Sequence, residues 1–397
     1  MQSAKIMVGT TTGFDPLTMH TIEKKIKDCG LSFGFNTVGI TSPEPFYRDE
    51  KATIERLDRG LMDGLPWYTK DRVRKANHPE VLLPDAKSII SVAVGYLSTE
   101  NDEIQESTVP RGKIARYARG LDYHNILKPK LRKFSEQIPV IAGKPVRCRI
   151  FVDDGPMNDR AAAERAGVGW FGKNTNIITQ SHGSWVLLGQ IITDLRLKPD
   201  IPLKKNCGSC VQCIIDCPTN AIVAPYTIDN TKCITFYTLE LRGVVPRDMR
   251  HLIGNWVFGC DICQEVCPPN IKALAGSEPA FEQRQDLSSP ELIPLLYMSE
   301  ESFRNRFRNS PIKRAKLIGL KRNVCIALGN IGNPIAVPPL ITILNSSEPL
   351  LRLHAAWALG KIGGVITRKA LISALNTEQD DSVSEEIHLS LKDMSEC

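Results

Sequence analysis

The chain has 397 residues, of which 42% are hydrophobic and 24% charged, and its formal net charge is +6 at pH 7. This composition excludes a largely disordered protein, and the length predicts about two or three domains that each bury a core. The sequence contains no apolar run of membrane-spanning length. Residues 1–17 lack the order of a signal peptide and carry no twin arginine, so we expect a cytoplasmic protein without a membrane partner.

The first 200 residues alternate between predicted helices and predicted strands. The helices are expected at residues 20–29, 122–138 and 157–167, and the strands at 35–40, 88–96, 146–153 and 184–195. The segment 88–96 is the clearest strand, because SIISVAVGY is a nearly continuous apolar run. Alternation of this kind predicts an α/β or α+β domain over about residues 1–200.

The strand expected at 146–153 runs into the sequence FVDDGPMNDR. Asp153 or Asp154 therefore lies at the end of a strand, where the sites of open sheets are commonly found. The simpler interpretation of either residue is a helix N-cap or a turn acid. A catalytic role for one of them is the sharper hypothesis.

A glycine-rich run, GVGWFGKN, occupies residues 167–174. It matches the pattern GxGxxG but follows a predicted helix and not a strand, so it is not a dinucleotide-binding fingerprint. Together with Trp170 and Lys173, the glycines indicate a close approach of the backbone to a flat or bulky group.

Eight of the twelve cysteines lie between residues 206 and 268. The first run, C-x2-C-x2-C-x3-C-P, has the spacing with which bacterial ferredoxins hold three corners of one cubane cluster and one corner of another. The second run lacks its first cysteine, and the isolated Cys233 is its natural replacement because two clusters need eight thiolates. The prediction is one 4Fe-4S cluster on Cys207, Cys210, Cys213 and Cys267, and a second on Cys217, Cys233, Cys260 and Cys263.

Zinc and disulfides are the alternatives for these cysteines. A zinc ribbon does not need a third cysteine followed by Cys-Pro in both runs, and disulfide frameworks are typical of short secreted chains. The other four, Cys29, Cys148, Cys325 and Cys397, are isolated and are expected to be buried or incidental thiols.

The C-terminal part contains an internal repeat. RNVCIALGNIG at 322–332 is echoed 31 residues later by LHAAWALGKIG at 353–363, and a further helix is expected after each, at 336–344 and 368–375. Paired helices at this period resemble HEAT repeats, which build extended binding surfaces. A plain helical bundle is the alternative. Residues 270–294 are rich in Pro, Ser and Glu and are expected to be a connection.

Positive charge is concentrated in segments 111–133 and 301–322, each with eight Lys or Arg and one acid. Tyr117, Tyr123 and His124 lie within the first segment. Basic stripes neutralise phosphates, and aromatic rings among them stack on exposed bases. A charge run is more often a solvated helix face, but two such segments favour a nucleic-acid partner.

Four motifs in combination resemble the epoxyqueuosine reductase family over essentially the whole chain. They are the VD…DR…E-x-AG-x-GW-x-GKN string over 152–174, RYARG-x-DYH at 116–124, G-x-C-x2-C-x3-CPT-x-AI at 208–222, and GCD-x-CQ at 259–264. The resemblance includes the spacing of all eight clustered cysteines.

The resemblance implies reduction of the epoxide of epoxyqueuosine to queuosine, at the wobble position of tRNAs with GUN anticodons. It implies cobalamin bound base-off, two 4Fe-4S clusters fed by an external donor such as flavodoxin or ferredoxin, and Asp153 as the proton donor. Burial against the corrin should keep Asp153 protonated. The corrin neighbours suggested by the resemblance are Trp170, Lys173 and Asn174, with Lys70 or Arg72 near its amide or phosphate tail.

The expected fold is α+β, related to that of reductive dehalogenases. It has a nitroreductase-like cobalamin-binding domain over 1–200, a ferredoxin-like two-cluster domain over 201–275, and HEAT-like helices for tRNA over 276–397. The basic segments are expected to hold the anticodon arm of a monomeric enzyme. The alternatives are a dehalogenase-like cobalamin and iron–sulfur reductase of a small molecule, and a non-catalytic ferredoxin-type electron carrier.

Overall fold

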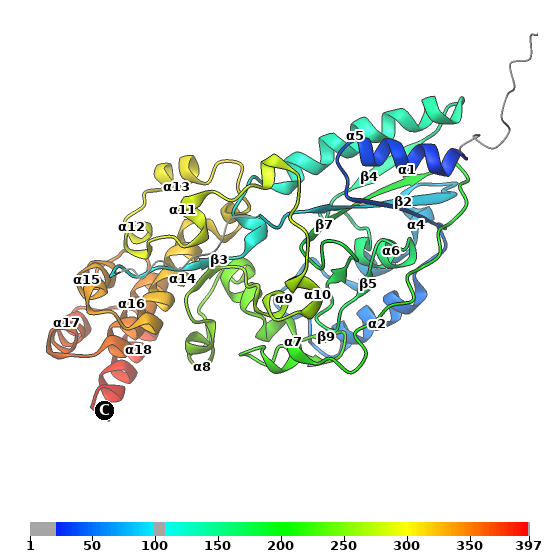
Figure 1. The fold of residues 1–397 in the computed structure, drawn as a ribbon. Helices are drawn as coiled ribbons and strands as arrows, with labels where there is room; N and C mark the ends of the chain where they lie inside the picture. Colours follow the sequence, from blue (N-terminus) through cyan, green and yellow to red (C-terminus); the bar gives the residue numbers. More distant parts are fainter. Residues whose placement is uncertain (1–20, 99–107, 396–397) are drawn as a thin grey trace, which may run out of the picture.

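The central element of the N-terminal half is a four-stranded sheet, shown on the right of Figure 1. The computed structural model describes residues 21–98 and 108–395. The sheet order is β1-β2-β7-β4, and each neighbouring pair is antiparallel. The strands are β1 Thr37–Thr41, β2 Ser88–Gly95, β7 Val186–Thr193 and β4 Cys148–Phe151. The segment 184–195, for which one or two strands are predicted, forms the single strand β7.

Helices cover both faces of this sheet. On one face, α1 (Ile22–Ser32) and α5 (Tyr123–Ala142) bury Ile26, Leu131 and Phe134 against apolar residues of β2 and β7. On the other face, α6 (Asp159–Arg165) packs its alanines against Ile89 and Ile192. The helices predicted at 20–29, 122–138 and 157–167 are these three, although residue 20 lies outside the described residues. The α+β prediction is confirmed.

Three further helices lie between β1 and β2. They are α2 Tyr47–Asp58, α3 Lys70–Asn77 and α4 Pro79–Leu82. The side chain of Thr69 caps α3 by accepting a hydrogen bond from the backbone N–H of Arg72 (3.2 Å). The sequence did not predict these helices, because α2 and α3 bury few residues and so lack a strong apolar period.

Short elements carry the cysteine-rich segment. They are β5 Trp170–Phe171, β6 Ile177–Ile178, α7 Gln212–Ile215, β8 Ile222–Ala224, β9 Thr227–Ile228, η3 Asn230–Lys232, α9 Ile262–Glu265 and α10 Pro268–Ile271. The helices α7 and α9 occupy equivalent positions in the two cysteine runs, because each contains the second cysteine of a C-x2-C pair. This cysteine is Cys213 in α7 and Cys263 in α9. In Figure 1, α7 and β9 lie below the sheet, and α9 and α10 lie just above α7.

The C-terminal half consists of helices. The main ones are α12 Leu292–Leu296, α13 Glu300–Arg306, α14 Lys316–Ile331, α15 Val337–Leu344, α16 Pro349–Ile362, α17 Val365–Leu375 and α18 Asp381–Asp393. The repeated sequences fall in α14 and α16, and the second helix of each pair is α15 or α17.

The remaining short elements lie between residues 113 and 336. They are β3 Lys113–Ile114, η2 Arg116–Ala118, η4 Phe236–Glu240, α8 Arg247–Arg250, η5 His251–Ile253, β10 Trp256–Phe258, η6 Pro279–Phe281, α11 Gln285–Ser288, η7 Pro311–Ala315 and η8 Pro334–Ala336.

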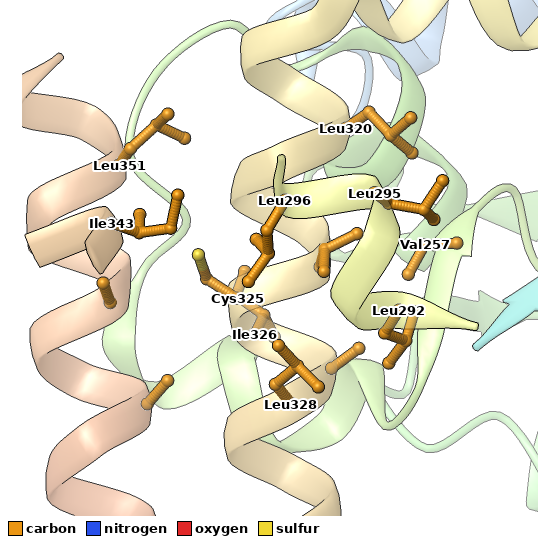
Figure 2. Close-up of a cluster of buried hydrophobic side chains, with 14 of the residues drawn as sticks. Val257, Leu292, Leu295, Leu296, Leu320, Cys325, Ile326, Leu328, Ile343 and Leu351 are labelled. Carbon is orange, nitrogen blue, oxygen red and sulfur yellow. The ribbon is translucent and has the colours of Figure 1, made fainter. Parts of the chain in front are cut away.

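One hydrophobic core joins these helices to the cysteine-rich segment. Figure 2 shows Val257 of β10 beside Leu292 and Leu295 of α12, next to Ile326 of α14. The same core includes buried residues from 234–258 and from 287–387. Residues 234–258 therefore pack with the C-terminal helices, although they fall within the ferredoxin-like domain expected over 201–275. None of the helices in residues 21–98 and 108–395 is long and apolar enough to cross a bilayer.

Two arginines of the basic segments are buried in the fold. Arg322 is 1% exposed, and its guanidinium donates to the carbonyls of Leu241 (2.9 Å) and Gly243 (2.8 Å), and to that of Tyr237. Arg119 is 3% exposed and donates to the carbonyl of Ile114 (2.8 Å). Neither side chain is available to an RNA phosphate, so contact of the basic segments with an anticodon arm stays a prediction for their other residues.

Replacing Arg322 by Met is expected to lower the free energy of unfolding by roughly 2–4 kcal/mol, because three main-chain carbonyls lose a charged donor that is itself buried. The midpoint of urea unfolding, followed by far-UV circular dichroism, measures the loss. Arg308→Met is the control, since Arg308 is exposed and comes from the same basic segment. Equal midpoints for the two variants would contradict the structural role of Arg322.

Candidate functional site

Four of the clustered cysteines surround one cavity. Its volume is about 160 Å³, and its lining includes Cys207, Cys210, Cys213 and Cys267, together with Trp170, Lys173 and Asn174. The ammonium of Lys173 donates to the carbonyl of Gly208 (2.8 Å), which ties the glycine-rich run to the first cysteine loop. The structure thus brings together, from two distant runs, the four cysteines predicted for the first cluster.

Two thiols of this cavity, those of Cys213 and Cys267, lose their protons less easily than an ordinary cysteine thiol. Burial, and then the neighbouring thiols of the cavity, raise the pKa of Cys267 to about 11. Burial and the same neighbours raise the pKa of Cys213. A donor set of this kind needs positive charge inside the cavity before it loses its protons, and the iron atoms of a cluster supply that charge.

The other four cysteines form a second set. Burial raises the pKa of Cys233, Cys260 and Cys263, and the charges of neighbouring cysteines, together with that of Asp261 for Cys260 and Cys263, add to this effect. Cys217 acts on Cys233 and Cys260, which places it in the group. Cys213 also acts on Cys263, so the two sets are neighbours.

The arrangement does not form a preformed site for a single metal ion. A zinc ion requires its sulfur ligands within ~2.3 Å, and in residues 21–98 and 108–395 no three His, Cys, Asp or Glu side chains are grouped to hold one ion. Among the isolated cysteines, Cys325 is buried and Cys29 and Cys148 are partly exposed, while Cys397 lies outside the described residues.

Asp153 lies two residues beyond the end of β4, with a left-handed backbone (φ 51°). Its Oδ2 accepts a hydrogen bond of 2.6 Å from the hydroxyl of Tyr123 at the start of α5. Tyr123 is buried, and burial together with the charge of Asp153 raises the pKa of its hydroxyl, so it stays a donor. Its neighbour Asp154 pairs instead with Lys128. Of the two candidate acids, Asp153 is the one held by a buried donor.

Two further groups near Asp153 were not predicted as site residues. Burial, and then the charge of Asp153, raise the pKa of the Asp159 carboxyl well above its usual range. Arg314, from η7, acts electrostatically on Tyr117 and Tyr123 and feels the charge of Asp153. Asp159 belongs to a motif quoted above, but no local pattern distinguishes it from a helix-capping acid. The expectation that Tyr123 could stack on a base is wrong, because its ring is buried.

Several buried polar atoms in this half have no hydrogen-bond partner among the described residues. They are Ser91 Oγ, Asp159 Oδ1, Trp170 Nε1 and Gln190 Oε1. Ser91 and Gln190 lie opposite each other on β2 and β7. The amide nitrogen of Gln190 donates to the main-chain oxygen of Asp159 (3.2 Å), so three of the four atoms belong to one neighbourhood. Buried polar atoms of this kind need a polar ligand.

The residues suggested as corrin neighbours separate into two places. Arg72 donates to the carbonyl of Gly155 (3.3 Å), two residues after Asp153. Trp170, Lys173 and Asn174 instead line the first cysteine cavity, and Asn174 also donates to the carbonyl of Cys263 (3.1 Å). Lys70 is half-exposed and pairs with Asp58 (2.5 Å). Contact of these residues with a corrin stays a prediction.

Comparison with known proteins identifies the family. Residues 77–154 match the family described as epoxyqueuosine reductase QueG, DUF1730; residues 206–270 match a 4Fe-4S double cluster binding domain, and 317–392 match HEAT repeats. The chain is 37% identical to the epoxyqueuosine reductase of Escherichia coli K12 over 350 residues, covering 87% of this chain and 91% of that one. The Bacillus cereus enzyme is 36% identical over 367 residues, with coverage of 91% and 94%.

The chain belongs to the epoxyqueuosine reductase family. Solved structures agree: one of epoxyqueuosine reductase with an epoxyqueuosine-modified tRNA-Tyr stem loop has a TM-score of 0.88 at 32% identity, covering 94% of this chain and 99% of that one. Another, from Bacillus subtilis with its catalytic aspartate loop swung out of the active site, has a TM-score of 0.87 at 32% identity and the same coverage. The resemblance, the double-cluster segment and the HEAT repeats predicted from the sequence are confirmed.

Proposed function

We propose that this protein reduces the epoxide of epoxyqueuosine to queuosine at the wobble position of tRNA, with cobalamin and two 4Fe-4S clusters as cofactors. The observations that carry the proposal are two neighbouring sets of four cysteines and one acid, Asp153, held at a strand end by Tyr123. The names of the relatives support the reaction, and the stem-loop complex of a related enzyme supports the substrate. The cytoplasm, where tRNA is modified, is the expected location.

The polar atoms without partners fit cobalamin. A corrin ring carries several amide side chains, which both donate and accept hydrogen bonds. Gln190 Oε1 and Asp159 Oδ1 are ready acceptors for an amide N–H, and Ser91 Oγ can donate to an amide carbonyl. When bound, cobalamin supplies the reduced cobalt that delivers electrons to the epoxide carbon.

Asp153 is the proposed proton donor. Conversion of the epoxide to an alkene consumes two electrons and two protons and releases the epoxide oxygen as water. Oxygen departs more easily once protonated, and a positioned general acid of this kind contributes ~10²–10⁴-fold to the rate. Tyr123 would hold the carboxyl at the strand end, where the left-handed backbone of Asp153 directs it out of the sheet.

The surroundings of the two cysteine sets suggest a direction for the electrons. The hydroxyl of Tyr117 feels the charges of both Asp261 and Asp153, and Asp261 lies in the C-x2-C step of the second set. The second set is therefore the one nearer Asp153. Cys210 of the first set is exposed. We assign the first cluster as the outer one and the second as the inner one of the relay.

The C-terminal helices offer the RNA contacts nearest to this site. Arg304, Arg308, Lys313 and Lys316 are exposed and form no ion pair with another described residue. They flank Arg314, which is electrostatically coupled to Asp153. An anticodon arm lying along α13 and η7 would bring its wobble base toward Asp153, and a monomer suffices for this geometry.

Nucleoside mass spectrometry of tRNA from a strain lacking this gene tests the reaction. The expected result is accumulation of epoxyqueuosine, reversed by a plasmid copy of the gene. Normal queuosine levels in a strain with no second enzyme for this step would overturn the proposal, and the iron–sulfur protein would then be an electron carrier for another reaction.

Tyr123→Phe tests the positioning role of the hydroxyl. Loss of the hydrogen bond between Tyr123 and Asp153 corresponds to about two- to tenfold in rate, and we expect that loss in kcat with the KM for the stem loop unchanged. Tyr47→Phe is the control, because Tyr47 is exposed and far from Asp153 in sequence and contacts. A rise in KM alone would show that Tyr123 serves RNA binding and not the acid.

A further inference from the structure

The outer cysteine set opens onto an exposed apolar and basic surface. Val211 and Ile215, at the two ends of α7, are 39% and 67% exposed, and Ile271, at the end of α10, is 76% exposed. Cys210, Pro268 and Pro269 line the same cavity, so the segments that carry these side chains meet there. We call this surface the carrier face and define it as Lys204, Lys205, Val211, Ile215, Ile271 and Lys272.

The carrier face has an excess of positive charge. Its three lysines are exposed and form no ion pair with another described residue. Lys205 lies over the ring of Trp170 (5.5 Å to the centroid), and Lys173 at the rim donates to a main-chain carbonyl, so neither charge is neutralised by an acid. The acids beside the face are Glu265, which is exposed, and Asp216, which accepts a hydrogen bond from Gln212 (2.5 Å).

The carrier face and the proposed RNA surface are on different sides of the molecule. In Figure 1, α7 lies in the lower part of the view and α13 in the upper part. Two helices that are far apart in one view are at least as far apart in the molecule. A protein bound at the carrier face would therefore leave the tRNA in place. The reaction needs two electrons, so a one-electron carrier has to bind twice while the tRNA stays bound.

We propose that the carrier face docks an acidic one-electron carrier protein, and that electrons enter at the Cys210 edge of the outer cluster. The inference rests on the proposed function and specifies its partner surface. Electron-transfer encounters use small interfaces, below ~1,200 Å², with a few apolar contacts and complementary charge that raises the association rate. In each encounter the carrier is oxidised by one electron and the cluster is reduced by one, and no bond is made or broken.

Stopped-flow mixing with reduced flavodoxin, whose surface is acidic, tests the proposal on anaerobically reconstituted full-length protein. The readout is the second-order rate of flavodoxin oxidation, measured against ionic strength, together with the equilibrium Kd. The double variant Lys204→Glu, Lys272→Glu is expected to lower this rate at least about tenfold at low salt and to abolish its decrease with added salt. Ile271→Asp is expected to weaken Kd with little change in salt dependence.

The control is Val140→Asp with Lys144→Glu, which places one apolar-to-acidic change and one Lys→Glu change on an exposed part of α5 and the turn after it, away from the cysteines. The proposal would be overturned if the carrier-face variants oxidised flavodoxin at the wild-type rate. It would also be overturned if the control variant lowered that rate equally. Reduction by dithionite needs no docking, so dithionite-driven turnover and iron content should match the wild type in every variant. If the wild type takes up electrons from flavodoxin but leaves epoxyqueuosine unchanged, the proposed function fails while the carrier face stands.

Discussion

Asp153→Asn is expected to lower turnover of epoxyqueuosine-containing tRNA by ~10²–10⁴-fold, because the amide has no acidic proton to give to the departing oxygen. The substitution is well suited to the position. Asp153 has a left-handed backbone (φ 51°), which Asn adopts more readily than most residues. The Asn side chain can still accept a hydrogen bond from Tyr123. The loop geometry should therefore survive while the chemistry is lost.

Single-turnover kinetics with a modified stem loop measure this effect, and iron content and RNA affinity should stay at wild-type values. Asp154→Asn is the matched control, since Asp154 is the adjacent acid and pairs with Lys128 on the surface. We expect near-normal turnover from it. Near-normal turnover of Asp153→Asn would remove Asp153 from the mechanism, and loss of activity in both variants would point to the loop and not to one acid.

Cys233→Ala is expected to remove the inner cluster and with it nearly all turnover. The isolated Cys233 is the member of the second set that has no place in a C-x2-C run, so no neighbouring cysteine can replace it. Iron content should fall from about eight to about four atoms per chain, because the first set is complete without it. Iron analysis and electron paramagnetic resonance of the reduced protein count the remaining clusters.

Cys148→Ala is the control for Cys233→Ala. Cys148 lies on β4 outside both sets and should leave the iron content unchanged. If Cys233→Ala kept about eight irons, the ligand assignment would be wrong. If it lost both clusters, the two cysteine sets would form one folding unit. The proximity of Cys213 to Cys263 would explain that result.

Local patterns predicted most of the elements that position the site. The strand at 88–96 is recognisable because a buried strand needs an apolar side chain at almost every position, and the repeats in α14 and α16 because stacked helices need small residues where they touch. Gly329 illustrates this point: a Cβ added there would approach the ring of Trp357 in the next repeat to 2.8 Å. The helices α2 and α3 had no such signal, since they bury few residues.

The sequence alone determined the fold class, the double-cluster segment, the repeat and the family, because each is encoded in short spacings or periodicities. Only the tertiary structure decided which charges are on the surface and which groups surround the acid. Arg322 bonds to carbonyls about 80 residues away, and the hydroxyl of Tyr123 reaches Asp153 across 30 residues of chain. Burial and hydrogen bonding between distant segments depend on how the chain packs, and no local pattern of residues contains that information.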